Sequence, residues 1–233
     1  MNGVKNGEFT VEEFISKSLE RISLVDEKLH AFLRVNDLAV KKAKEIGYQR
    51  NLLASNLRKS KSNTIGVIVP RISRHFFSST IAGIEEASYA QGYNVIICQS
   101  MEKLEREIKI VNNLISNRVD GILVSVSMET TEDTHLKQFD LSNIPLVFFD
   151  RALSEMPNSK VLIDSIKASY DVTQHLIDQG CRKIVHIGGP ATLDIYKDRF
   201  KGYKQALQEN NLPFEENRVY TSALNEQEGR KII

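Results

Sequence analysis

A short cationic segment is the part of the sequence whose side chains are best suited to binding a polyanion. The stretch from Tyr48 to Asn63 contains no Asp or Glu, and it carries four cations, Arg50, Arg58, Lys59 and Lys61. Lysine and arginine neutralise phosphates, so a local excess of them indicates a nucleic-acid contact. The apolar residues 64–70 that follow predict a strand entering a core. The alternative is an ordinary solvated linker between two domains.

The rest of the chain does not share this charge. Formal net charge is only +1 over 233 residues, and residues 1–47 carry eight cations and eight acids. Any polyanion site must therefore be local. The composition, 41% hydrophobic and 26% charged, is that of an ordinary globular protein.

Targeting, redox and metal signals are weak throughout the sequence. No apolar run approaches the roughly 18 residues that a membrane helix needs, and the N-terminus has no apolar region typical of a secretion signal. We therefore expect a cytoplasmic protein without a membrane partner. Cys98 and Cys181 lie in or beside apolar runs and indicate reduced core thiols. No metal-ligand spacing occurs, and no cofactor is predicted.

Strands and helices alternate after the cationic segment. Strands are predicted at 64–70, 93–99, 121–126 and 144–150, with helices at 76–91, 102–117 and 132–140. Continuous apolar strands of this kind are typical of a parallel sheet covered on both faces, with right-handed crossovers. A second series then alternates strand and helix, over 160–164, 167–178, 183–189, 197–210, 218–222 and from Asn225. The predicted class is α/β, a doubly wound parallel lobe plus an incomplete second lobe, after a helical segment at 10–46.

From about Lys44 to Ile233 the chain resembles the lactose-repressor (LacI/GalR) type of transcription regulator. The resemblance rests on KEIGYQRNLLASNLRKSKSNTIGVIVP, IAGIEEASYAQGYNVIICQS, NRVDGILVS, PLVFFDR, HLIDQGCRKIVHIGG and DRFKGYKQAL, which occur in family order. It implies lobes of the type I periplasmic-binding-protein fold and a homodimer. The expected domains are an N-terminal helical segment at 1–47, a hinge at 48–63, and ligand-binding lobes at 64–159 and 160–233.

The resemblance also implies a DNA-contacting hinge. Residues 51–61 match the hinge helix, which folds when a dimer binds operator DNA, and Leu57 matches a leucine that enters the minor groove. An apolar wedge of this kind unstacks a base step while flanking cations hold phosphates. The hinge residues expected to contact DNA are Asn51, Ala54, Ser55, Leu57 and Arg58.

A small-molecule effector site is implied at the carboxyl ends of the parallel strands, where open α/β sheets bind ligands. Aromatic faces combined with Asp and Arg suit a polyhydroxyl ligand such as a sugar. The expected effector-binding residues are Phe76, Phe77, Ser125, Asp150, Arg151, Asp164 and Arg199, with Ser127 nearby. Core packing is the alternative for Phe77, and an ion pair at a domain crossover is the alternative for Asp150 and Arg151.

The N-terminal residues depart from this family. Residues 10–36 contain no glycine and no pattern of a helix-turn-helix. Residues 10–46 instead resemble the N-terminal helices of the A subunit of glutamyl-tRNA amidotransferase. That family's Gly-Ser-rich loop with its catalytic Lys and serines is absent, so no enzyme activity is expected. The second lobe shows three strands where five or six are usual, so we expect a chimeric or truncated chain.

The sequence therefore predicts a DNA-binding transcription regulator controlled by a small, sugar-like effector, with weakened binding of both DNA and effector. Operator DNA is a doubtful partner without a helix-turn-helix. The alternative is a sugar-binding module without a DNA role.

Overall fold

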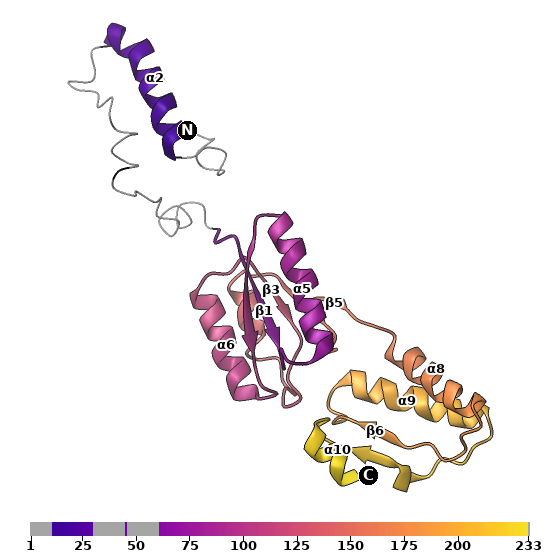
Figure 1. Cartoon of the computed structure of the whole chain (residues 1–233). Helices are drawn as coiled ribbons and strands as arrows, with labels where there is room; N and C mark the ends of the chain where they lie inside the picture. Colours follow the sequence, from indigo (N-terminus) through magenta and orange to yellow (C-terminus); the bar gives the residue numbers. More distant parts are fainter. Residues whose placement is uncertain (1–10, 30–44, 46–60, 233) are drawn as a thin grey trace. The chain divides into compact units, whose positions relative to one another are not determined.

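The computed structural model describes residues 11–29, 45 and 61–232 (Figure 1). Contacts divide the chain into two compact units, Met1–Ser62 and Asn63–Ile233. The described helix of the first unit is α2, Val11–Leu29, a continuous helix of 19 residues. Ile15, Leu19 and Ile22 are partly buried on one face of it, while Leu24 on another face is 71% exposed. The expected helix at 10–46 is confirmed over α2, and the rest of that range is outside the described residues, residue 45 excepted.

The second unit contains a five-stranded parallel sheet in the order β2-β1-β3-β4-β5. Its strands are β1 (Thr64–Val69), β2 (Asn94–Gln99), β3 (Gly121–Val124), β4 (Leu146–Phe149) and β5 (Ser159–Val161). The helices between them are α5 (His75–Ala90), α6 (Leu104–Ser116) and the short α7 (Lys137–Leu141). The order changes direction at β1, whose neighbours β2 and β3 lie on its two sides. This confirms the predicted doubly wound α/β class.

Helices cover both faces of this sheet (Figure 1). On β1, Val67 and Val69 pack with Phe77 and Ile81 of α5. The intervening Ile68 points to the other face, where the core includes residues of α6 and α7. The inner strands β1, β3 and β4 are covered on both faces, so their residues have to be apolar in succession, which is the pattern seen in the sequence. The edge strands β2 and β5 are more exposed.

The apolar run at 160–164 was expected to open the second lobe, and this is wrong. β5 instead adds to the first sheet, where Phe148 is paired with Lys160 and Phe149 with Val161. The backbone N–H of Asp150 also donates to the carbonyl of Val161. Leu162 and Ile163, which follow, are exposed. An apolar run predicts a strand but does not specify which sheet it joins.

A second group of elements follows from Ser165 onward. It contains α8 (Ser165–Asp178), β6 (His186–Gly188), α9 (Asp194–Glu209), the 3-10 helix η1 (Glu216–Arg218), β7 (Val219–Thr221) and α10 (Glu226–Ile232). β6 and β7 form a parallel pair. Their core packs Tyr203, Ala206 and Leu207 of α9 against Ile177 of α8 and Ile184. Among the described residues, no helix is both long and apolar enough to cross a bilayer.

Candidate functional site

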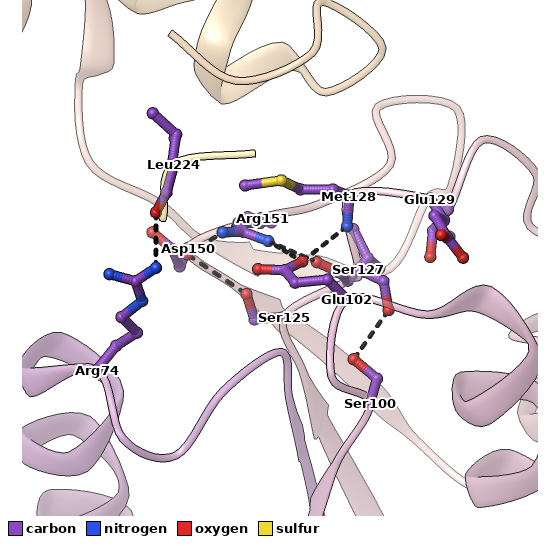
Figure 2. Close-up of polar contacts among 12 residues, drawn as sticks. Arg74, Ser100, Glu102, Ser125, Ser127, Met128, Glu129, Asp150, Arg151 and Leu224 are labelled. Carbon is purple, nitrogen blue, oxygen red and sulfur yellow. Dashed lines mark hydrogen bonds and ion pairs between the residues drawn. The ribbon is translucent and has the colours of Figure 1, made fainter. Parts of the chain in front are cut away.

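Polar loops at the carboxyl ends of β2, β3 and β4 meet in one cluster (Figure 2). Ser125 follows β3, and its hydroxyl lies 3.4 Å from Oδ2 of Asp150, the residue directly after β4. The backbone N–H of Ser125 donates to the carbonyl of Ile68 in β1. Two of the effector residues expected from sequence are therefore neighbours at the predicted edge of the sheet.

Asp150 has an unusual backbone and an unusual charge environment. Its φ is +59°, in the left-handed region, where Asp is among the few residues often found. Burial raises the pKa of its carboxyl, and the nearby positive charges of Arg151 and Arg199 partly oppose that rise. Asp150 is thus a partly desolvated carboxylate, able to accept hydrogen bonds from ligand hydroxyls.

Arg151 lies at the centre of the cluster. Its Nη1 donates to Oε2 of Glu102 at 2.8 Å, and its Nε is 3.8 Å from Oδ2 of Asp150. Its guanidinium also stacks over the Tyr196 ring, 5.7 Å from the ring centroid. The contact with Tyr196 links α9 to the loop after β4.

A second carboxylate, Glu107 of α6, is fully buried beneath the loop after β3. Its Oε2 accepts from the backbone N–H of Ser127 at 2.8 Å and from the Ser127 hydroxyl at 2.6 Å. Its Oε1 accepts from the Thr130 hydroxyl and contacts Nε2 of His135, each at 2.8 Å. These donors lower the pKa of Glu107 although burial alone would raise it.

Phe76 and Phe77 have different surroundings although they are adjacent. Phe76 is 50% exposed near the start of α5. Phe77 is 4% exposed, and its ring packs edge-on against Phe149 with 6.4 Å between centroids. Phe77 is therefore occupied by the core of the first sheet, because a helix turns adjacent side chains about 100° apart. Of the two rings, only that of Phe76 is open to solvent.

Asp164 and Arg199 lie in the second group of elements, at the start of α8 and within α9. Asp164 is exposed and caps α8, since its Oδ1 accepts from the backbone N–H of Lys167 at 2.9 Å. Arg199 of α9 is partly buried. Its positive charge acts to lower the pKa of both Asp150 and His186. Ser127 is fully buried, and its hydroxyl donates to Oε2 of Glu107.

A cavity of about 450 Å³ opens beside Asp150. Its other lining residues come from the segment after β4, from β5 and the segment after it, and from the starts of α8 and α9: Ala152, Ser154, Lys160, Leu162, Ile163, Ser165, Asp194, Ile195, Asp198 and Lys201. Of the effector residues expected from sequence, the cavity includes Asp150 alone. Asp150 thus faces both the cavity and the polar cluster.

The expected hinge residues Asn51, Ala54, Ser55, Leu57 and Arg58 are outside the described residues. Among those the structure describes, no group of His, Cys, Asp and Glu could hold a metal ion.

Sequence reasoning did not single out Glu102, Glu107, His135 or Tyr196 as parts of the site. A signal existed for Glu107, because it shares the buried stripe of α6 with Val111 and Leu114 at helical spacing. A carboxylate on an otherwise apolar stripe indicates buried donors opposite it. Nothing comparable marks Glu102, which lies in a loop and pairs with a residue 49 positions away.

Residues 62–233 match the family of periplasmic binding proteins and sugar binding domains of the LacI family. The chain belongs to this family.

Transcription regulators are among its relatives. It is 30% identical over 190 residues to the ribose operon repressor of Halalkalibacterium halodurans, covering 81% of this chain and 55% of that protein. It is 34% identical over 169 residues to catabolite control protein A of Priestia megaterium, covering 72% of this chain and 50% of that protein. The chain spans about half the length of these curated relatives.

Solved structures of LacI-type regulators are also similar to this chain. The transcription regulator CcpA of Lactococcus lactis superposes with a TM-score of 0.67 at 29% identity, covering 72% of this chain and 62% of that one. A LacI-type regulator from Alkaliphilus metalliredigens, solved with D-xylulofuranose, has a TM-score of 0.59 at 30% identity, with coverage of 69% and 56%.

Proposed function

We propose that this chain is part of a transcription regulator whose α/β region binds a small polyhydroxyl effector at the cluster around Asp150. The observation that carries the proposal is the convergence of Ser125, Asp150 and Arg151 at the carboxyl edge of a parallel sheet. The sugar complex of the Alkaliphilus relative supports the same ligand class.

The side chains at this edge match the needs of a sugar. Asp150 supplies an acceptor for hydroxyl groups, and the guanidiniums of Arg151 and Arg199 supply donors. Phe76, half-exposed at the start of α5, offers an aromatic face for the apolar side of a sugar ring. Asp164 contributes less in this proposal, because its carboxylate is engaged in capping α8.

Calorimetric titration of the full chain with a panel of pentoses and hexoses tests the effector site. We expect saturable binding of at least one sugar, lost in Asp150→Asn and in Arg199→Ala. Asp171→Asn is the matched control, because Asp171 is an exposed carboxylate paired with Lys167 on α8. Binding that survives in Asp150→Asn and Arg199→Ala would place the sugar elsewhere.

We propose further that residues 48–63 contact operator DNA as a hinge in a homodimer, with Leu57 and Arg58 at the contact. Support comes from the cationic composition of this segment and from the repressors among the relatives. We expect the affinity to be low and strongly salt-dependent, because the sequence of residues 10–36 shows no helix-turn-helix pattern. A helix-turn-helix needs two helices joined by a tight turn, and Val11–Leu29 contains none.

Gel-shift titration on palindromic DNA at several salt concentrations tests this part. Weak binding that falls steeply with salt, and falls further in Arg58→Ala, supports a hinge contact. Binding with nanomolar affinity and strong sequence preference contradicts the expected weakness. Sugar binding with no DNA binding at low salt favours a sugar-binding module without a DNA role.

The similarity of residues 10–46 to amidotransferase helices stays a prediction.

A further inference from the structure

The guanidinium of Arg151 already forms an ion pair with a carboxylate of the protein, that of Glu102. Oε2 of Glu102 accepts from Nη1 of Arg151 at 2.8 Å and from the backbone N–H of Met128 at 2.9 Å. The two side chains are only 18% and 10% exposed. Figure 2 shows both hydrogen bonds converging on Glu102. A shielded pair of this kind is screened little by salt, so Arg151 is neutralised by the protein itself.

The backbone is shaped to make this pair. Met101 and Glu102 are consecutive non-glycine residues with φ of 57° and 63°, and Asp150, next to Arg151, has φ of 59°. Left-handed backbone is unfavourable for such residues and persists where surrounding contacts hold it, often at functional positions. Here the N–H of Met101 donates to the carbonyl of Pro70 at 2.9 Å, which holds the loop after β2 in place.

The charges that act on the candidate site are balanced. Those that shift the pKa of Asp150 belong to Arg151, Arg199 and Glu102. Together with Asp150 itself they make two cations and two carboxylates. Arg74 is exposed, and its Nη2 donates to the backbone carbonyl of Leu224. A phosphate or carboxylate on Arg151 would bring a further negative charge next to Glu102 and Asp150, whose side chains are only 18% and 12% exposed. Like charges in a shielded site repel strongly, and the charge of Arg151 is already compensated by Glu102.

We propose that Glu102 is a specificity-determining residue that restricts this site to uncharged polyhydroxyl ligands and excludes phosphorylated or carboxylated ones. This inference rests on the proposed effector site and adds the charge class of its ligand. An uncharged hydroxyl can accept from Arg151, or donate to Asp150, without displacing Glu102.

Inorganic phosphate is the probe for this role, because it tests Arg151 without knowledge of the effector. Glu102→Gln removes the charge, and its amide oxygen can still accept from Met128. We expect the full chain with Glu102→Gln to bind phosphate about tenfold or more tightly than wild type in calorimetry. The gain should vanish in the double variant Glu102→Gln/Arg151→Met.

Glu129→Gln is the matched control. Glu129 lies on the neighbouring loop and forms an ion pair with Lys103, but its side chain is 45% exposed. It should bind phosphate as wild type does. Unfolding midpoints of all variants show whether each one folds. Equal phosphate affinity in wild type and folded Glu102→Gln overturns the proposal, and so does an equal gain in Glu129→Gln. Failure of Glu102→Gln to fold moves the comparison to Glu102→Asn, which is shorter and also uncharged.

Sugars compared with their phosphate esters complete the test and separate it from the proposed function. Ribose with ribose 5-phosphate, and glucose with glucose 6-phosphate, are the pairs. Wild type should prefer the uncharged member, and Glu102→Gln should lose that preference. If the wild-type chain prefers the phosphate ester, the proposed role of Glu102 is wrong, although an effector site is supported. Phosphate gain in Glu102→Gln with no sugar bound by any variant supports Glu102 and contradicts the proposed effector.

Discussion

Oε1 of Glu107 lies 2.8 Å from Nε2 of His135, and both side chains are almost fully enclosed. The contact joins α6 to the segment before α7 across 28 residues of sequence. The same carboxylate accepts from the backbone of Ser127, two residues after the proposed effector residue Ser125. A single buried side chain therefore fixes the loop that forms part of the candidate site.

Glu107→Ala should reduce the free energy of unfolding by about 3–5 kcal/mol, because it leaves several buried donors without an acceptor. Urea denaturation measures the loss. Glu105→Ala is the control, since Glu105 lies on the same helix with an exposed side chain paired to Lys109. Its unfolding midpoint should match wild type. Equal midpoints for both variants would mean that Glu107 contributes little.

The stability of the chain should respond in opposite directions to the titration of Glu107 and Asp150. The folded pKa of Glu107 is lowered, so the stability it contributes is present above its unfolded pKa and is lost as pH falls through the folded value. The folded pKa of Asp150 is raised by burial, so its contribution is most favourable at low pH and is lost as pH rises through the folded value.

Asp150→Asn should therefore stabilise the ligand-free chain at pH 7 and have little effect near pH 3, while it abolishes effector binding. Glu107→Gln should flatten the loss of stability on the acid side. Urea denaturation between pH 3 and pH 8 measures both. A destabilised Asp150→Asn at pH 7 would show that the carboxylate is worth more to Arg151 and Arg199 than its desolvation costs.

Alanine variants of the adjacent residues Phe76 and Phe77 should have different effects, one on ligand binding and the other on stability. Phe77→Ala removes a buried ring that packs on Phe149 and should cost about 3–5 kcal/mol of unfolding free energy. Phe76→Ala should change stability by less than about 0.5 kcal/mol, because the ring is half-exposed, and should weaken sugar binding. Denaturation and calorimetry on both variants test this. Unchanged sugar affinity in Phe76→Ala would remove that ring from the site.

The sequence predicted those parts of the site that depend on local pattern. Asp150 and Arg151 could be expected at the site because they directly follow a continuous apolar strand, and such strands end at a shared edge. The position of Phe77 could not be separated from that of Phe76, because the two differ only by one step around a helix. Glu102 joins the polar cluster through contacts with Met128 and Arg151, far along the chain. Its role depends on the packing of loops, which leaves no local pattern.

Two glycines in helices should respond oppositely to alanine. A Cβ on Gly202 of α9 would collide with the carbonyl oxygen of Ile166 and lie 2.8 Å from the N of Tyr170. The close approach of α8 and α9 leaves room only for a hydrogen atom in place of a side chain at Gly202. Gly202→Ala should therefore lower the free energy of unfolding by about 1–3 kcal/mol or more. A Cβ on Gly83 of α5 would meet no atom within 4 Å apart from its chain neighbours and the adjacent backbone of its own helix. Gly83→Ala should therefore raise stability by about 0.5–1 kcal/mol through helix propensity alone. Urea denaturation of the two variants side by side measures the difference. A tolerated Gly202→Ala would mean that α8 and α9 can move apart without loss of stability.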